Sequence, residues 1–281
     1  MSSGVKGLLI LAVFALASIS LGGVFAAEAE GTAGTSMHML RLQHASNVSS
    51  NWSGYVAGAS DTAATATSFA TVAGRWVQPK VSCTSGRQSA SAFWVGLGGS
   101  SEASHALEQI GTEADCNASG KATYSMWYEL VPAASVPIKL KVLSGNVITA
   151  SVAVQGTKVT VQIRNVSRRT KFTKVLRMSS PDTSSAEWVA EAPSACNSRG
   201  RCVVLPLTNF GTVSFTQATA IGNAHHGTIS DPAWTAAPIE LVSDPSVARR
   251  TGSTALDNAV PSALSPVGTS FTVAYGTVSA S

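Results

Sequence analysis

Residues 146–166 read "NVITASVAVQGTKVTVQIRNV", and this stretch decides the fold class. Its first half alternates with a period of two, and one set of alternate positions is Ile148, Ala150, Val152 and Val154. Such alternation is typical of a β-strand with one buried face. The glycine in "VQGTKV" predicts a hairpin turn into a second strand. Because one face of the first strand is wholly apolar, we expect it to pack against another sheet.

The rest of the chain repeats this theme of short alternating or apolar runs separated by Gly, Pro, Asn and Ser. We find no long segment with the 3.6-residue period of a helix. Many antiparallel strands in a chain of this size indicate two packed sheets, so we predict an all-β sandwich. The other strand candidates are "SFATVAGRWVQP", "SAFWVGLG", "ATYSMWYELVP", "PIKLKV", "SSAEWVAEAP", "GTVSFTQATA", "PIELVS" and "SFTVAYGTV".

The composition is poor in charge. Charged residues make up 12% of the 281 residues, and the net charge is +4. This small, scattered charge does not support nucleic-acid binding, and the one basic cluster, "RNVSRRTKFTK" at 164–174, alternates like a solvated strand and hairpin. Only 15 residues are acidic. Because few groups change charge as the pH falls, we expect the fold to tolerate acid.

The N-terminal region predicts export. Lys6 precedes the apolar run "GLLILAVFALASISLGG", and the small residues of "VFAAEAEG" follow. This pattern is typical of a signal peptide. A membrane anchor is the alternative, but the run is short and contains Ser and Gly, and no later segment reaches spanning length. We therefore predict a signal peptide over 1–27, a propeptide or linker over 28–46, and one domain over 47–281. The mature chain is expected to be secreted, monomeric and free of the membrane.

The cysteines fit an oxidising compartment. All four, Cys83, Cys116, Cys196 and Cys202, follow the leader, and four cysteines allow three pairings. The stretch "CNSRGRC" closes a short loop rich in turn formers, so we predict a Cys196–Cys202 disulfide, which leaves Cys83 with Cys116. A zinc site is the alternative, but the sequence has neither CxxC pairs nor histidines at ligand spacing. We expect no metal.

Common catalytic motifs are missing from the sequence. It contains no GxSxG, no HExxH and no DTG or DSG triplet. His225 and His226 lie in a loop context typical of a solvated turn, so a Ser-His-Asp mechanism has little support. Carboxylates and amides remain as candidates for chemistry.

Residues 185–191 read "SAEWVAE" and carry two glutamates, Glu187 and Glu191, four positions apart. On a helix this spacing would stack like charges, whereas Val and Trp favour a strand. On a strand, Glu187, Val189 and Glu191 share one face. Four residues of strand span about 13 Å, so the two carboxylates cannot meet. A catalytic partner of either glutamate must lie elsewhere in the chain.

Two further stretches combine aromatic and polar residues. In "FWVGLGGSSEASHALEQIGTEADC", Trp94 precedes a glycine-rich turn, and Gln109 follows it. In "YSMWYELVPA", Trp127 and Glu129 lie ahead of a proline. Each aromatic cluster taken alone is more typical of core packing than of a binding cleft.

Together these stretches resemble the glutamic peptidases, the eqolisin family of acid-acting endopeptidases, and the bacterial branch more than the fungal one. The resemblance covers most of residues 50–275. It rests on "NWSGY", "FWVGLGG", "LEQIGTEADC", "WYELVP", "SSAEWVAEAPS", "LPLTNFGTVSF" and "PSALSPVGTSFTV", which occur in this order.

The resemblance implies two bent antiparallel sheets of about seven strands each, with a concave face that takes an extended peptide. It also implies a catalytic pair without a cofactor. The glutamine of the family motif matches Gln109, and the glutamate matches Glu191 rather than Glu187. Trp94 would help to wall the cleft, and we add Trp52, Trp127 and Glu129 as further residues that line it.

The chemistry of this pair is independently reasonable. Peptide hydrolysis without a metal or a covalent nucleophile needs a base for water and a donor for the developing oxyanion. A carboxylate can be the base in acid, and an amide stays neutral and offers N–H donors at any pH. A Glu–Gln pair thereby avoids the shared proton of two adjacent carboxylates.

One position departs from the family pattern. The family commonly has Asp within WVGxDG, and this chain has Gly98 there. We therefore expect an accessory carboxylate near the cleft to be missing.

The alternative function is a secreted β-sandwich binding module for carbohydrate or peptide, which would use the same aromatic residues as stacking platforms. Such a module would need neither Gln109 nor Glu191.

Overall fold

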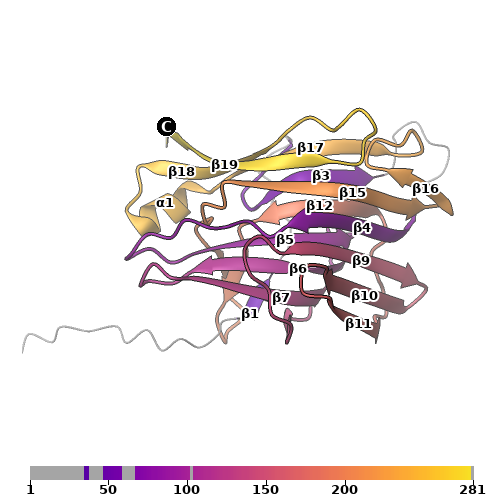
Figure 1. The fold of residues 1–281 in the computed structure, drawn as a ribbon, viewed down its shortest axis with the longest axis horizontal. Coiled ribbons are helices and arrows are strands. Elements are labelled where there is room, and N and C mark those ends of the chain that lie inside the picture. The colour runs from indigo at the N-terminus through magenta and orange to yellow at the C-terminus, as the bar shows by residue number, and fades with distance from the viewer. Residues whose placement is uncertain (1–34, 38–46, 59–66, 102–103, 280–281) are drawn as a thin grey trace, which may run out of the picture. The chain divides into compact units, whose positions relative to one another are not determined.

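The computed structural model describes residues 35–37, 47–58, 67–101 and 104–279. The predicted signal peptide lies outside these residues, as does most of the segment 28–46. The regular secondary structure of the described residues is almost entirely antiparallel β-strand, which confirms the all-β sandwich (Figure 1). No helix in this part of the chain is long and apolar enough to cross a membrane.

One layer of the sandwich, called the β12 sheet here, has the strand order β17-β3-β12-β5-β6-β7-β8. Its strands are β17 (Thr235–Val242), β3 (Trp52–Gly58), β12 (Ser185–Glu191), β5 (Ser89–Leu97), β6 (Leu107–Cys116), β7 (Ala122–Val131) and β8 (Val136–Ile138). The predicted run "PIKLKV" thus forms a strand only at its start, because β8 ends at Ile138.

The second layer, called the β9 sheet here, has the order β11-β10-β9-β4-β15-β19-β18. Its strands are β11 (Thr170–Arg177), β10 (Lys158–Asn165), β9 (Val147–Gln155), β4 (Phe69–Val77), β15 (Thr212–Gly222), β19 (Phe271–Ser279) and β18 (Ala255–Pro261). The hairpin predicted from residues 146–166 is β9 and β10, with Lys158 opposite Gln155 beside the turn. The basic cluster spans the end of β10, a turn and the first half of the outer strand β11, in line with the predicted strand and hairpin.

The strands of the two layers form one continuous hydrogen-bonded series, because β17 pairs with strands of both layers. Residues Thr235–Ile239 of β17 pair with β3, whereas Leu241 and Val242 pair with β18. A strand that changes sheets makes such a corner between two packed layers.

Short elements complete the described chain. A three-stranded sheet has the order β1-β13-β14, and β2 and β16 pair with β17 and β15. These elements are β1 (Thr35–Met37), β2 (Val48–Ser49), β13 (Ser194–Cys196), β14 (Cys202–Val204), β16 (His225–Thr228) and α1 (Pro245–Thr251). Asp244 caps α1 by accepting a hydrogen bond from the Ser246 N–H. The strand β1 lies within the segment predicted as a propeptide or linker.

The main core fills the space between the two layers. Alternate residues of β12, β5 and β9 point into it, including Trp188, Phe93 and Ile148. The indole N–H of Trp188 on β12 donates to the Ala73 carbonyl of β4 at 2.8 Å, and that of Trp76 on β4 donates to the Thr112 hydroxyl of β6 at 3.0 Å. These bonds satisfy buried tryptophan donors and tie the layers together.

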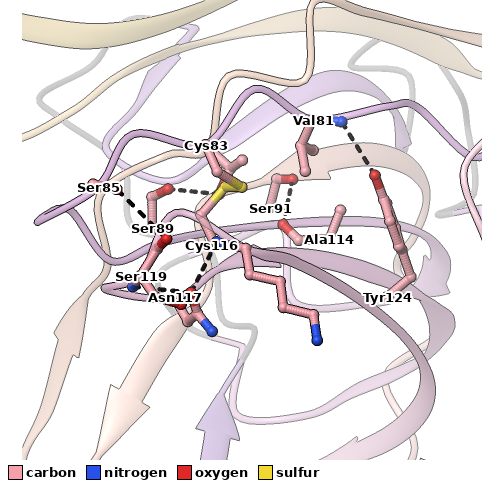
Figure 2. The surroundings of a disulfide bond; sticks show 12 residues. Val81, Cys83, Ser85, Ser89, Ser91, Ala114, Cys116, Asn117, Ser119 and Tyr124 are labelled. Atoms are coloured by element: carbon pink, nitrogen blue, oxygen red, sulfur yellow. Dashed lines mark hydrogen bonds between the residues drawn. A yellow bond between two sulfur atoms is a disulfide. The ribbon is translucent and has the colours of Figure 1, made fainter.

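Both predicted disulfides are present. Cys83 joins Cys116, and Cys196 joins Cys202 across the β13–β14 hairpin. Figure 2 shows how the first disulfide fastens the loop before β5 to the end of β6, beside a turn in which Asn117 accepts N–H bonds from Ser119 and Lys121. This crosslink holds the outer end of β6, the strand that carries Gln109.

Candidate active site

The β12 sheet has a second apolar cluster on the face that points away from the main core. Side chains alternate along a strand, so Val189 and Trp94 face one way while Trp188 and Phe93 face the other. The cluster comprises Trp52, Ala92, Trp94, Leu107, Trp127, Val131, Val189 and Ile239. The structure therefore brings together all three tryptophans predicted for the cleft. The Trp52 and Trp94 rings meet edge to face, with their centroids 4.8 Å apart.

Glu191 lies on this same face, at the end of β12, and is fully buried. Both oxygens of its carboxylate accept hydrogen bonds. The Trp94 indole N–H donates to Oε2 at 2.8 Å, and the Asn51 amide donates to Oε1 at 3.2 Å. Both donors are uncharged N–H groups, and such donors favour the charged form of a carboxylate.

Asn51 is a neighbour of Glu191 that the sequence reasoning did not single out. Its Oδ1 accepts a bond from the Ser49 hydroxyl at 3.1 Å, which turns its amide nitrogen toward Glu191. Ser49 in turn accepts the backbone N–H groups of Asn51 and Trp52. The motif "NWSGY" held the clue, but the contact with Glu191 spans 140 positions in the sequence.

Gln109 and Glu129 form a second polar contact on this face. The Gln109 amide donates to the Glu129 carboxylate at 2.8 Å, and both side chains are fully buried. They lie opposite each other on β6 and β7. Glu129, which was predicted only to line the cleft, is thus a direct partner of the predicted catalytic glutamine.

The strand register decides which site residues are neighbours. Gln109 lies opposite Gly96, and Gly96 lies opposite Glu187, so Gln109 shares a row with Glu187. Glu191 belongs to the row of Ala92 and Glu113. The structure thus groups Glu191 with Asn51 and Trp94, and Gln109 with Glu129.

Trp94 connects these two groups. A Cβ atom on Gly96 would lie 2.9 Å from Cζ3 of Trp94 and 3.2 Å from Cβ of Gln109. The six-membered ring of Trp94 therefore occupies space that a side chain at position 96 would need, next to Gln109. The other end of the indole bonds Glu191. Glycine at position 96 allows Trp94 to extend from Gln109 to Glu191.

The opposite end of β12 carries a different set of carboxylates: Glu187, Glu108 and Asp182. Burial raises the pKa of Glu187 well above its usual value; the Ser185 hydroxyl opposes this rise, and the charges of Asp182 and Glu108 add to it. Burial also raises the pKa of Glu108 to about 8. Burial acts to raise the pKa of Asp182 as well, but hydrogen bonds from Ser104, Ser184 and Gly99 leave it below its usual value. In acid, Glu187 and Glu108 are therefore neutral.

Within the described residues, no group of three His, Cys, Asp or Glu side chains is arranged to hold a metal ion. The polar groups on the outward face of the β12 sheet are instead carboxylates and amides on an aromatic floor. Such a set can bind an extended chain, accept a proton and donate hydrogen bonds.

The fold is shared with known glutamic peptidases. Scytalido-glutamic peptidase, solved with a peptide-based transition state analogue, matches with a TM-score of 0.63 and 24% identity over 81% of this chain and 98% of that chain. SCP-B, a member of the eqolisin family solved with the tripeptide Ala-Ile-His, matches with a TM-score of 0.60, the same identity and the same coverage. Aspergilloglutamic peptidase from Aspergillus niger matches with a TM-score of 0.52 and 23% identity over 67% of this chain and 99% of that chain.

The comparison with family models identifies the chain directly. The model of the Peptidase A4 family matches residues 50–260, which include both candidate catalytic residues. A comparison with curated protein sequences found no significant relative. The match to the family model covers most of the chain and sets aside the alternative of a non-catalytic binding module. The chain belongs to the Peptidase A4 family, the glutamic peptidases, and is a peptide-bond hydrolase.

Proposed function

We propose that this protein is a secreted endopeptidase that works in acid, with Glu191 as the general base and Gln109 as the donor to the oxyanion. The observation that carries the proposal is the environment of Glu191: a buried carboxylate held at both oxygens by the neutral donors Trp94 and Asn51. The two disulfides fit an oxidising compartment outside the cytosol.

The choice of Glu191 over Glu187 follows from their surroundings. Glu187 lies in the row of Gln109, which makes it the rival base by position. However, a general base must be ionised at the working pH, and the pKa of Glu187 lies well above its usual value. In acid Glu187 is protonated and cannot accept a proton. Glu191 has neutral donors on both oxygens, which favour its ionised form.

The reaction then proceeds in two stages. Glu191 takes a proton from a water molecule as the water oxygen attacks the scissile carbonyl carbon. The carbonyl oxygen gains negative charge, and an N–H of Gln109 donates to it. The tetrahedral species collapses when the C–N bond breaks, and the proton on Glu191 passes to the leaving nitrogen. The products are a carboxylic acid and an amine, and Glu191 returns to its ionised form.

Glu129 gives the Gln109 amide its direction. Its carboxylate accepts one of the two amide hydrogens, so the nitrogen of Gln109 faces Glu129 and the orientation of the amide is set. The second N–H of the same nitrogen is the donor in the reaction. A fixed donor costs no reorganisation when the oxyanion forms.

The substrates in this proposal are extended segments of protein chains. The aromatic cluster on the same face offers large apolar surfaces for substrate side chains. One strand pairing supports a role for the segment before the domain. Strand β1 pairs antiparallel with β13, which begins three residues after Glu191. We therefore keep residues 28–46 as a proposed propeptide.

The decisive experiment compares the two glutamates of β12. Turnover of denatured casein is measured at pH 3–5 with wild type, Glu191→Gln and Glu187→Gln, each verified as folded by circular dichroism. Glu191→Gln keeps the shape of the side chain and one acceptor oxygen but loses basicity, so we expect turnover to vanish. Glu187→Gln replaces a protonated acid by an amide of the same shape and should keep most of the activity.

The opposite pattern, an inactive Glu187→Gln and an active Glu191→Gln, would assign the base to Glu187. Wild-type rates in both variants would contradict the glutamic mechanism altogether.

The propeptide has its own test. When the secreted chain is acidified below about pH 5, where carboxylates and histidines have changed charge, intact-mass measurement should show loss of the N-terminal segment. An active enzyme of unchanged mass would contradict it.

A further inference from the structure

The position of Gly98 is filled by another residue's carboxylate. A Cβ atom placed on Gly98 would lie 2.5 Å from Cβ and 2.7 Å from Cγ of Asp182. Asp182 comes from the loop before β12, more than eighty positions later in the sequence. The expectation that a carboxylate is missing here is therefore wrong. Position 98 is glycine, but the carboxyl group of Asp182 lies where its side chain would be. Gly98 also has a φ of +82°, a backbone conformation that residues other than glycine rarely adopt.

Asp182 is held by four hydrogen bonds that join three elements. Its carboxylate accepts the backbone N–H of Gly99 at 3.2 Å, just after β5, and that of Ser184 at 2.9 Å, just before β12. It also accepts the hydroxyl of Ser104, in the connection to β6. Its own backbone N–H donates to Oε1 of Glu108 at 3.2 Å. Asp182 thus ties the end of β5 and the start of β6 to the start of β12.

The bond to Glu108 makes this link relevant to catalysis. Glu108 is fully buried and immediately precedes Gln109 on β6. Among the described residues, the Glu108–Asp182 cluster does not belong to a group of three or more candidate metal ligands. Its hydrogen bonds instead fix the strand that presents Gln109 against the strand that presents Glu191.

We propose that Asp182 is a positioning residue for peptide hydrolysis, which fills the space above Gly98 and fixes Gln109 relative to β12 through Glu108. The inference rests on the proposed function, because it assumes that Gln109 takes part in the reaction. It adds a residue from a loop that no catalytic motif of the sequence includes. A displacement of about 1 Å of a catalytic group can cost a hundred-fold in rate.

The test uses the full-length chain, processed as it is when active, and measures kcat and KM separately at pH 4. Asp182→Ala removes all carboxylate acceptors, and we expect kcat to fall on the order of ten- to a hundred-fold with KM changed less than about two-fold. Asp182→Asn keeps the size and an acceptor oxygen, and it should retain at least about half of the wild-type kcat. Glu108→Ala breaks the same link from its other end and should reproduce the loss, whereas Glu108→Gln should not.

Asp231 offers a matched control. Asp231 also lies close to a glycine, because a Cβ atom placed on Gly227 would be 2.5 Å from Cγ of Asp231. Its carboxylate accepts the Ala233 N–H and contacts His225. Asp231→Ala should leave kcat unchanged. Melting temperatures of all variants separate lost folding from lost positioning.

The inference is overturned if Asp182→Ala keeps the wild-type kcat, if its loss of kcat matches its loss of folded protein, or if Asp182→Asn is as inactive as Asp182→Ala. The proposed function fails differently. If Glu191→Gln remains active, the assignment of the base is wrong whatever Asp182 does.

Discussion

The two ends of β12 carry the same side chain in two different environments. Glu187 and Glu191 are both glutamates, both fully buried, and both on the outward face of one strand. Around Glu191 lie the N–H donors of Asn51 and Trp94. Around Glu187 lie the carboxyl groups of Asp182 and Glu108, whose charges add to the effect of burial on its pKa.

The difference teaches that burial alone does not decide the charge of a carboxyl group. Burial disfavours the ion at both ends of the strand. N–H donors, which favour the ion, lie at one end, whereas the charges of neighbouring carboxyl groups, which disfavour it, act at the other. One strand can therefore hold a candidate base and a neutral acid about 13 Å apart. The following predictions test this contrast, from the largest expected effect on turnover to the smallest.

The largest effect concerns Gln109, which shares its row with Glu187 but is proposed to work with Glu191. Gln109→Ala removes the oxyanion donor, and we expect kcat to fall by on the order of a hundred- to a thousand-fold. Gln162→Ala is the matched control, because Gln162 is an exposed glutamine on β10 that bonds Thr173. Steady-state kinetics at pH 4 that show equal rates for the two variants would contradict the role of Gln109.

The second prediction makes the Glu191 end resemble the Glu187 end. Asn51→Asp places a second carboxyl group beside Glu191, and two adjacent carboxyls share a proton, which raises one pKa by about one to three units. We expect kcat/KM at pH 4 to fall by up to about a hundred-fold and to recover as the pH rises, because the base must then lose its proton at higher pH.

The pH profile of kcat/KM measures this shift in the acid limb. Asn117→Asp is the control, since Asn117 is an exposed turn residue whose side chain oxygen accepts N–H bonds. A profile of Asn51→Asp that overlies the wild-type profile would show that Asn51 does not influence the base.

The third prediction removes one donor without adding charge. Trp94→Phe keeps the aromatic packing but loses the N–H bond to Glu191, and a bond to a charged group contributes about 1.5–3 kcal/mol. We expect activity at pH 4 to fall about ten-fold or more. Trp234→Phe also loses indole hydrogen bonds, to Thr228 and Ile229, in another part of the core. It should lower the melting temperature and leave kcat unchanged.

The smallest effect on turnover, and a clear effect on stability, is expected for Glu187→Gln. Glu187 holds its proton in the folded chain at pH values where the unfolded chain has lost it. The free energy of unfolding therefore decreases as the pH rises above about 4.5, by about 1.4 kcal/mol per pH unit for each such group. Glutamine has no proton to lose, so the variant should show a shallower decrease between pH 5 and 8.

Urea unfolding at several pH values measures this slope. Asp244→Asn is the control, because the pKa of Asp244 is lowered by the hydrogen bonds of Ser246. Its stabilising effect is present above its unfolded pKa and is lost only as the pH falls below that range, so the slope between pH 5 and 8 should stay as in wild type. An unchanged slope in Glu187→Gln would mean that Glu187 is ionised in the folded chain.

The alternation of residues predicted most of the fold, because strand faces are local properties. The strands β9, β10 and β12 could be predicted in this way, and both disulfides could be predicted from the short loop "CNSRGRC" and the two cysteines that it leaves. The helix α1 and the strands β3, β6 and β18 were not among the predicted elements. Seven residues are too few to show a helical period, and β18 alternates weakly. Strand β17 connects the two sheets because it pairs with both β3 and β18. These pairings join segments that are distant in the sequence, so the pattern of one strand cannot predict them.

The candidate site could be predicted only in part. Gln109 and Glu191 came from the family resemblance, whereas Asn51 and Asp182 are linked to Glu191 and Glu108 by contacts across the fold. Gly98 shows the limit most clearly. The sequence indicates that a carboxylate is absent at this position, and the structure supplies one from another loop. Space that a glycine leaves open is filled by whatever the fold brings there, and residue order does not encode it.

The continuous strand order also has a consequence for how the molecules behave in concentrated solution. Its path ends at two strands, β11 and β8. An unpaired strand edge can add a strand from another molecule, and this is a common route to aggregation. Strand β11 presents Lys171, Lys174 and Arg177 at its edge, and β8 is three residues long with Pro137 at its centre. Positive charge at one end and a missing N–H donor at the other oppose edge-to-edge growth. We therefore expect the enzyme to stay dispersed as single molecules, even in acid, where the loss of carboxylate charge leaves the lysines and arginines to repel one another.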